Sequence, residues 1–445
     1  MADNLDYWRR ILAVLDPQRS LREDEIEALY APRPEAPSEQ LRNQLRLAAV
    51  GFGGPEKVLM CGARGSGKTT ELVRLGRLMR DDYVPIRVDL AAALPSGSGT
   101  VPLLAVFAIA GLHALHAWKA PDADLVEPRK RLDGALSALS SVGEVASGLG
   151  ELVSGVAPLV TVFGVPAAAS VGVTGVAMGQ MGLQLQKLRD FARTLRGAEL
   201  DPANIEQTRD LVETVNGLFR QLQALTGRPA LLLADGLDKQ DELEDVFAAL
   251  ESPDLIQRIE VPVVLTGPVN LRHDPRFRGL RNHFRNEILF NVAVRKPPGD
   301  AHAEGEQVLM DLYERRRAAA ALPKDLFQDS DLRHAASMSA GIVRDFLSIL
   351  YDAGLEAFSE GRDIVTSGDL ATGVRKLRQM MQMALNSDRI VLLGRVLKKR
   401  VLPPGMEASR LLYENYVACY PNGDVWYRPH EVLVDYVTRN QESRG

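Results

Sequence analysis

A short glycine-rich stretch near the start of the chain carries residue types that can bind phosphate. Residues 62–69 read GARGSGKT, with an apolar run before them and a helix-forming run after them. Glycines let the backbone curl until its N–H groups point at phosphate oxygens, and the following helix adds its positive end. The pattern therefore predicts a phosphate loop for a nucleoside triphosphate, with Lys68 at the β- and γ-phosphates. The predicted loop residues are Gly62, Ala63, Arg64, Gly65, Ser66, Gly67, Lys68, Thr69 and Thr70.

Two oxygen-bearing side chains are candidates for a magnesium site. Thr69 follows the lysine of the loop, at the position whose hydroxyl ligates Mg²⁺. Asp235 ends the apolar run 231–235, LLLAD, where a carboxylate can hold Mg²⁺ through water. An aspartate that merely caps a helix is the alternative. We predict Thr69 and Asp235 as the metal ligands.

The residues after Asp235 bear on hydrolysis. Many motor ATPases place a Glu immediately after this aspartate to activate water, whereas this chain has Gly236. Asp238, two residues further on, is the nearest acid that can orient a nucleophile. Thr266 ends a second apolar run, 261–266, and is a candidate contact to the γ-phosphate or the attacking water. We expect slow hydrolysis, which favours a switch over a motor.

Length, charge and cysteine content exclude several other classes of protein. The chain has 445 residues, a net charge of -5 and 2 cysteines. The length predicts two or three domains, and the acidic balance argues against a general nucleic-acid coat. Two distant cysteines exclude a disulfide scaffold and a four-cysteine zinc site. The first residues include acids and no apolar core, so we expect a cytoplasmic protein rather than a secreted one.

Apolar runs alternate with helical patterns through much of the chain. Residues 57–61, 83–90, 231–235 and 261–266 read as buried strands, and helical patterns separate them. Continuous apolar strands argue for a parallel sheet covered on both faces by helices. We therefore predict an α/β fold of the phosphate-loop type, followed by a helical lid over residues 296–384.

Residues 143–186 interrupt this pattern with a segment rich in Gly, Ala and Val. No charged residue occurs between Glu151 and Lys187. The length allows one membrane span, and a buried or self-packed hairpin is the other interpretation. Its glycines lower the hydrophobicity, and no aromatic or basic anchors frame it closely. We therefore favour the buried hairpin.

The C-terminal part carries a hairpin signal. The segment YENYVACYPNGDVWYRPHEV contains two aromatic, β-prone runs joined by residues 421–424, PNGD. Asn-Gly favours a tight hairpin because both residues tolerate positive φ. Helices before this hairpin predict a winged-helix-like module. A basic cluster could contact a phosphate backbone, with a solvated helix face as the alternative: Arg375, Lys376, Arg378, Arg395, Lys398, Lys399 and Arg400.

These motifs resemble those of AAA+ and STAND phosphate-loop ATPases, especially bacterial relatives of the NACHT and origin-recognition types. GARGSGKTTEL and LLLADGLDK carry most of the resemblance, and DGLD is similar to the NACHT-type Walker B motif. SAGIVRD, residues 339–345, resembles the sensor-2 region of the lid, which implies a γ-phosphate contact for Arg344. YRPHEVLVDY is similar to the part of STAND winged helices where a His senses bound ADP, which implies that role for His430.

The chain departs from these families at three points. Lys239 replaces the second acid of the NACHT pattern, and Gly267 and Pro268 follow Thr266 where STAND relatives often carry an Arg. No helical repeat array follows the ATPase motifs. Residues 143–186 also resemble the hydrophobic segments that KAP-type ATPases carry between their Walker motifs.

The motifs and the resemblance imply a nucleotide-dependent switch. We expect ATP and ADP as ligands, Mg²⁺ as cofactor, and an output through a homo-oligomer or an operon-encoded partner protein, in bacterial signalling or antiviral defence. The alternatives are a DNA-binding AAA+ loader that uses the winged helix and a KAP-like ATPase that contacts membrane through residues 143–186. The expected domains are a helical segment (1–50), the ATPase core (51–295), the lid (296–384) and the winged-helix-like domain (385–445).

Overall fold

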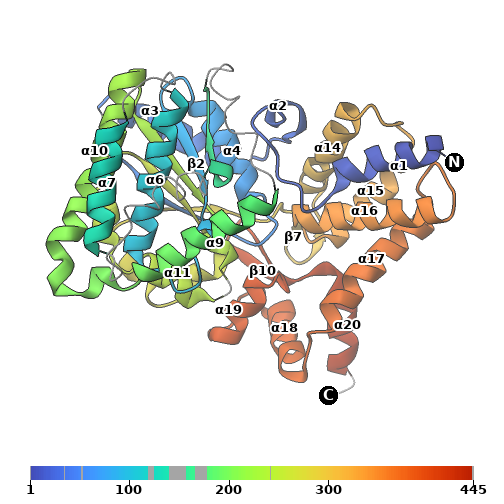
Figure 1. The fold of residues 1–445 in the computed structure, drawn as a ribbon. Coiled ribbons are helices and arrows are strands. Elements are labelled where there is room, and N and C mark those ends of the chain that lie inside the picture. Colours follow the sequence, from blue (N-terminus) through green and yellow to red (C-terminus); the bar gives the residue numbers. More distant parts are fainter. Residues whose placement is uncertain are drawn as a thin grey trace. The chain divides into compact units, whose positions relative to one another are not determined.

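A computed structural model describes residues 2–34, 36–51, 54–118, 125–139, 157–165, 178–240 and 242–442 (Figure 1). Contacts within it divide the chain into two compact units. The sheet unit comprises Pro37–Cys61 and Glu71–Glu287, and the helical unit comprises Met1–Ala36, Gly62–Thr70 and Ile288–Gly445. By its contacts, the predicted phosphate loop therefore belongs with the N-terminal and C-terminal segments of the chain.

The sheet unit is built on a 6-stranded sheet in the order β3-β2-β4-β5-β1-β6. β2, β4 and β5 are parallel, and β3 runs antiparallel to β2 at the edge. Every residue of β1, β4 and β5 is buried, as expected where helices cover both faces, so the predicted α/β sheet is confirmed. The strands are β1 (Lys57–Gly62), β2 (Val84–Asp89), β3 (Val160–Val162), β4 (Ala230–Asp235), β5 (Val263–Pro268) and β6 (Arg285–Leu289).

Helices flank this sheet. In Figure 1, α6, α7 and α10 lie side by side along one side of the strands, and α4 lies on the other side. The amphipathic α10 turns one apolar stripe inward and ends at Gly227, whose φ of 71° allows the left-handed cap. The helices are α3 (Pro37–Ala49), α4 (Lys68–Met79), α5 (Leu90–Ala93), α6 (Thr100–Trp118), α7 (Val126–Leu139), α9 (Met178–Thr194), α10 (Ile205–Thr226), α11 (Leu243–Ala249), α12 (Pro253–Gln257) and α13 (Phe277–Leu280).

One helix, α6, is apolar on all sides. Among the described residues it alone is long and apolar enough to cross a membrane by length and composition. In the structure 89% of its apolar window is buried, and it packs against β2 and α10. A helix that is hydrophobic all round is accounted for by burial of this kind.

Part of the predicted hydrophobic insert belongs to the sheet. Residues 160–162 form β3, and the buried Phe163 ring packs so closely on Gly76 of α4 that an added Cβ would lie 2.7 Å from it. This part is an edge strand and not a self-packed hairpin. Residues 143–156 and 166–177 lie outside the described residues, so the hairpin and membrane interpretations stay predictions there.

The helical unit contains the N-terminal helices and the helices that follow the sheet in the chain. The predicted N-terminal helix is confirmed as α1, whose buried Trp8, Ile11 and Leu15 share one face, and it packs against α16. The helices are α1 (Ala2–Leu15), α2 (Ile26–Leu29), α14 (Ala303–Ala319), α15 (Asp329–Met338), α16 (Val343–Ser359) and α17 (Ser367–Gln382). A two-stranded ribbon, β7 (Arg295–Lys296) and β8 (Asp300–Ala301), precedes α14.

The end of the chain forms the predicted winged-helix-like arrangement. It comprises α18 (Ser387–Lys399), α19 (Met406–Tyr413), β9 (Val417–Tyr420), β10 (Trp426–Pro429) and α20 (Glu431–Glu442). β9 and β10 pair antiparallel, which confirms the hairpin. The turn prediction is wrong in one respect, because Gly423 has a positive φ of 97° but Asn422 does not. The Asn422 side chain instead accepts from Trp426 Nε1 at 2.9 Å and donates to the Arg295 carbonyl at 2.7 Å.

Candidate functional site

The backbone of residues 62–69 has the conformation that its glycines predict. Gly65 and Gly67 have φ values of 77° and 98°, a backbone region that residues other than glycine rarely adopt. Both glycines also have close neighbours. A Cβ on Gly65 would lie 2.6 Å from Arg344 Cβ, and one on Gly67 would lie 2.6 Å from Arg33 Nη2. Two arginines therefore lie directly against this loop.

Lys68 begins α4 at the end of the loop. Its buried ammonium donates to the Gly62 carbonyl at 2.8 Å and to the Ala63 carbonyl at 2.7 Å. The first-turn residues Thr69 and Thr70 are half-buried. The N-terminal N–H groups of α4 and the Lys68 charge both favour an anion at this turn.

Three polar atoms beside the loop are buried and have no hydrogen-bond partner among the described residues. They are Ser66 Oγ, Arg33 Nη1 and Arg344 Nε. A buried donor without a partner costs about 1–3 kcal/mol, so such groups are rare unless a ligand or water satisfies them. Two of the three belong to guanidinium groups, which bind phosphate and carboxylate oxygens. The loop with its two arginines is therefore a candidate anion site.

The position of Arg344 is fixed by its neighbours. Its backbone N–H donates to the Gly65 carbonyl at 3.2 Å, at the start of α16. Gly341, three residues earlier, has a φ of 74°, and a Cβ there would lie 1.8 Å from the Val292 carbonyl oxygen. Gly341 therefore permits the close approach of the chain to Val292 just before Arg344.

A small apolar cavity of about 40 Å³ adjoins the loop. Gly67 and Thr70 form one side of it, and Tyr30, Val308 and Val343 line the rest together with neighbouring apolar residues. Arg33 and Arg316 place guanidinium groups at its wall. Arg316 is 5% exposed, and burial lowers its pKa to about 10. Ligand pockets usually measure about 300–1,000 Å³, so this cavity would have to widen to hold more than a small group.

A second cluster lies at the end of β4 in the sheet unit. Asp235 is 0% exposed and Asp238 is 5% exposed. The Thr266 hydroxyl, at the end of the buried part of β5, donates to Asp238 Oδ1 at 2.9 Å and accepts from the Gly236 N–H at 2.7 Å. The contact from Thr266 Oγ1 to Asp235 Oδ1 is longer, at 3.5 Å. The predicted residues Asp235, Asp238 and Thr266 are thus brought together.

The structure explains why glycine follows Asp235. Gly236 has a φ of 110°, and a Cβ there would lie 2.7 Å from the backbone nitrogen of Ala91. Any side chain would strain the backbone and collide with α5. A glutamate in the position used by motor ATPases is therefore excluded by this turn.

We expect the Gly236→Ala substitution to lower the free energy of unfolding by about 1–3 kcal/mol because of the positive φ and the collision. Denaturant unfolding monitored by circular dichroism measures this change. Gly217→Ala is the matched control, since Gly217 lies within the helix α10 and a Cβ there would meet nothing within 4 Å. An equal change in unfolding free energy for the two substitutions would show that the turn does not require glycine at position 236.

Two cations lie against the Asp235 carboxylate. Arg87 Nη2 of β2 is 3.6 Å from Asp235 Oδ2, and Lys239 Nζ is 3.5 Å from the same oxygen. Mg²⁺ usually takes one or two carboxylates, water and substrate phosphates, all hard oxygen ligands. Thr69 and Asp235 each offer an oxygen of this type, and their assignment as magnesium ligands stays a prediction. Among the described residues, no group of three or more His, Cys, Asp and Glu side chains could hold a metal.

His430 is fully buried at the end of β10. Its Nε2 lies 3.2 Å from Asp345 Oδ2, and its Nδ1 accepts from the Val432 N–H at 3.4 Å. Both ring nitrogens are therefore occupied by protein groups, and the partner Asp345 adjoins Arg344 in sequence. The ADP-sensing role of His430 stays a prediction. Any link from His430 to Arg344 runs through Asp345, which His430 contacts and which follows Arg344 in the chain.

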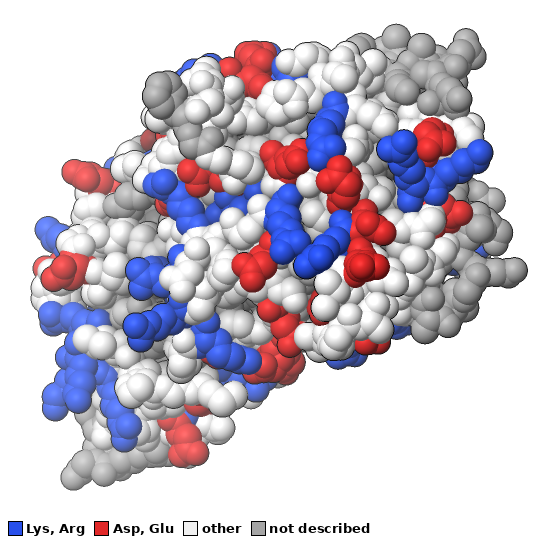
Figure 2. Space-filling model, turned by 90° about the vertical axis from the view of Figure 1, so that its left-hand side faces the viewer, with Lys and Arg blue, Asp and Glu red and all other residues white. Residues whose placement is uncertain are grey.

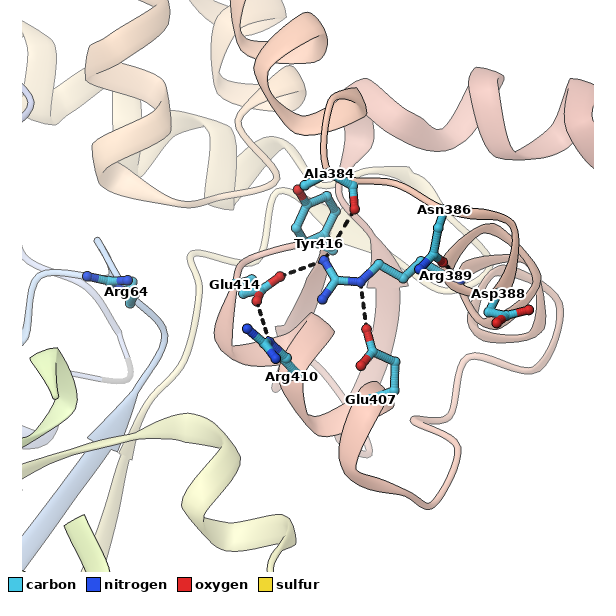
Figure 3. A pocket seen from close by; sticks show the side chains of 9 residues that line it. All are labelled: Arg64, Ala384, Asn386, Asp388, Arg389, Glu407, Arg410, Glu414 and Tyr416. Carbon is cyan, nitrogen blue, oxygen red and sulfur yellow. Dashed lines mark hydrogen bonds and ion pairs between the residues drawn. The ribbon is translucent and has the colours of Figure 1, made fainter. Parts of the chain in front are cut away.

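The predicted loop residue Arg64 contacts the C-terminal part of the chain. Its exposed guanidinium stacks over the Tyr413 ring at 5.4 Å, and its carbonyl accepts from Asn415 Nδ2 at 2.9 Å. Arg64 also lines a hollow of about 790 Å³ (Figure 3). Figure 3 shows Arg389 bonded to Glu407 and Glu414, and Arg410 bonded to Glu414. These charges are paired within the protein, so the hollow gets no ligand assignment.

Comparison with known proteins finds only distant structural likeness. No protein-family model and no curated protein matches the sequence. The ORC2 protein of Aeropyrum pernix in its ADP form is 13% identical, with a TM-score of 0.43 over 97% of this chain and 98% of that chain. The ORC1 protein of Aeropyrum pernix in complex with DNA is 14% identical, with a TM-score of 0.37 over 94% and 98%. Similarity at this level adds nothing to the site geometry.

Three features of the site are missing from the sequence prediction. Arg33 lies in a Pro-rich segment, and its contacts with Ser66 and Gly67 of the loop appear only in the structure. Arg87 lies on β2 among apolar residues, and its charge inside a strand is the signal that could have marked it. The cavity is formed by residues from separate segments, and no sequence motif marks it.

Proposed function

We propose that the protein binds ATP and ADP at residues 62–70 and acts as a nucleotide-dependent switch of the AAA+ and STAND type. The observation that carries the proposal is the set of buried polar atoms without partners beside the loop: Ser66 Oγ, Arg33 Nη1 and Arg344 Nε. Phosphate oxygens would satisfy all three. Isothermal titration of the full chain with ADP tests the proposal, and no heat of binding would overturn it.

In this proposal the loop residues hold the phosphates in named roles. The N–H groups of the loop and the first turn of α4 bind phosphate oxygens, and Lys68 neutralises their charge. Arg33 already donates to the Ser66 carbonyl at 2.5 Å and has a second nitrogen free for an oxygen. The cavity beside Gly67 takes the base, after widening from about 40 Å³. Mg²⁺, held by Thr69 and Asp235, would neutralise charge on the terminal phosphates.

Hydrolysis in this proposal is slow. The position directly after Asp235 is closed to an acid by the Gly236 turn. Asp238, the nearest acid, accepts the Thr266 hydroxyl at 2.9 Å. A base must lie within hydrogen-bond reach of the attacking water, and Asp238 has one oxygen engaged elsewhere. Slow turnover gives the bound state a long lifetime, which suits a switch.

The route from nucleotide to output runs through α16 in this proposal. Arg344 contacts the γ-phosphate, its neighbour Asp345 contacts His430, and His430 lies at the start of α20. The presence of the third phosphate would thus be transmitted to the winged-helix-like part. Oligomerisation or binding of a partner protein, in signalling or antiviral defence, is the proposed output. Sizing the protein with ADP and with a non-hydrolysable ATP analogue tests the first of these.

We expect Arg344→Ala to weaken ATP binding about tenfold and ADP binding less, because one charged hydrogen bond to the γ-phosphate is lost. Displacement of a fluorescent nucleotide measures both affinities. Arg333→Ala, an exposed arginine on α15, is the control and should change neither. Unchanged ATP affinity in Arg344→Ala would show that the arginine does not reach the phosphate.

A DNA-binding function is a second candidate, because α18 of the winged-helix-like part carries exposed positive charge. Arg395, Lys398 and Lys399 are exposed, and Arg400 follows them at the helix end. On the face drawn in Figure 2, Lys and Arg also gather toward the lower left, whereas the two signs alternate elsewhere. Duplex binding that falls steeply with salt would favour this function.

A further inference from the structure

The Asp235 carboxylate is held by two cations at one oxygen. Asp235 is 0% exposed, and Oδ2 lies 3.5 Å from Lys239 Nζ and 3.6 Å from Arg87 Nη2. Its other oxygen faces the Thr266 hydroxyl at 3.5 Å. A fully buried carboxylate needs charge compensation, and here protein groups supply it.

The two cations differ in freedom to move. Arg87 lies on β2, two residues before Asp89, which pairs with Asp235 of β4. The Arg87 side chain is 19% exposed. Lys239 ends a short 3₁₀ turn after Gly236, and its side chain is 36% exposed. A lysine side chain has four rotatable bonds and a compact ammonium that solvent can accept. Lys239 can therefore leave Asp235 more easily than Arg87, whose side chain is more buried.

We infer that Lys239 is a positioning residue that competes with Mg²⁺ for Asp235, an inference that rests on the proposed nucleotide-binding function. With Lys239 at Oδ2, Asp235 is neutralised and attracts a divalent cation weakly. When Lys239 swings into solvent, only Arg87 still compensates the carboxylate, which then attracts the water shell of Mg²⁺ more strongly. Lys239 thus lowers the affinity of Asp235 for Mg²⁺ until it leaves, so nucleotide binding and metal binding become separable steps.

The charge at position 239 is opposite to the charge in the pattern that this stretch resembles. The resembling NACHT pattern has an acid there, which would add negative charge beside Asp235. This chain has a cation in its place, within contact distance of the carboxylate. Exchanging acid for base turns a negative charge beside the metal site into a positive one, which weakens Mg²⁺ binding.

The test measures how much Mg²⁺ the full chain requires. Binding of a fluorescent ADP is followed from EDTA to saturating Mg²⁺, and electron paramagnetic resonance of Mn²⁺ measures metal bound to the protein–ADP complex. Lys239→Met should lower the half-saturating concentration of either metal roughly tenfold, because a charge in contact with Asp235 is removed. Lys239→Arg keeps the charge and should stay within about twofold of wild type.

A second lysine substitution serves as the control for Lys239→Met. Lys324→Met removes an exposed lysine from the loop before α15 and should leave the metal requirement unchanged. An unchanged or higher requirement in Lys239→Met would overturn the inference. Weaker ADP binding in EDTA by Lys239→Met would also overturn it, because Lys239 would then be a phosphate ligand. If wild type binds no ADP even at saturating Mg²⁺, the proposed function fails instead.

Discussion

Lys68→Ala should weaken ADP and ATP binding by at least about 100-fold. A charged hydrogen bond to phosphate is worth about 1.5–3 kcal/mol, and Lys68 also holds the loop by donating to the Gly62 and Ala63 carbonyls. The substitution therefore removes the phosphate's partner and two bonds that shape the turn. Isothermal titration with each nucleotide measures the loss directly.

The control for this substitution separates binding from folding. Lys324→Ala, at an exposed position, should bind both nucleotides as wild type does. Thermal unfolding of Lys68→Ala without nucleotide shows whether the chain still folds. A folded Lys68→Ala protein with wild-type affinity would remove the phosphate-loop assignment.

Asp235→Asn should spare nucleotide binding and reduce ATP turnover by at least about 100-fold. The amide keeps the shape of the side chain but loses the charge that, in the proposed function, orients a hydrated magnesium ion. Single-turnover hydrolysis with saturating Mg²⁺ measures the effect. Turnover at the wild-type rate would mean that another residue holds the metal.

The same substitution has a consequence for stability. The neutral amide would leave Arg87 and Lys239 without an anionic partner at this position, and Arg87 is mostly buried. Loss of its partner should lower the free energy of unfolding by about 1–3 kcal/mol. Asp245→Asn, on α11 away from this cluster, serves as the matched control. Equal unfolding free energies of the two variants would show that the pairing with Arg87 contributes little.

Features that depend on neighbouring residues in the chain could be predicted from the sequence. The loop 62–69 lies between a strand and a helix as its glycines require, and LLLAD forms a buried strand that ends at Asp235. The terminal hairpin follows from its aromatic runs and Gly423. Each of these depends on local backbone preferences and on burial patterns, which composition and spacing encode.

Features that depend on which segments meet could not be predicted in this way. Arg87 reaches Asp235 only because β2 pairs with β4 in a particular register, although the two strands lie far apart in the chain. Arg33 reaches the phosphate loop from a segment with no periodic pattern. The strand β3 lies in an apolar stretch whose composition also suits a hairpin or a membrane span, so composition alone did not predict its pairing with β2. Long-range pairing carries no local signature of its own.

The side-chain amide of Asn415 has a wider consequence. Asn415 adopts a φ of 67° just after α19 and donates to the Arg64 carbonyl, one residue before the first left-handed glycine of the phosphate loop. One hydrogen bond thus links the C-terminal module to the backbone of the loop. If nucleotide binds this loop as proposed and the bond couples the two parts, thermodynamic reciprocity makes the coupling mutual: a partner that displaces the C-terminal module changes nucleotide affinity by the same factor by which nucleotide changes the affinity for that partner.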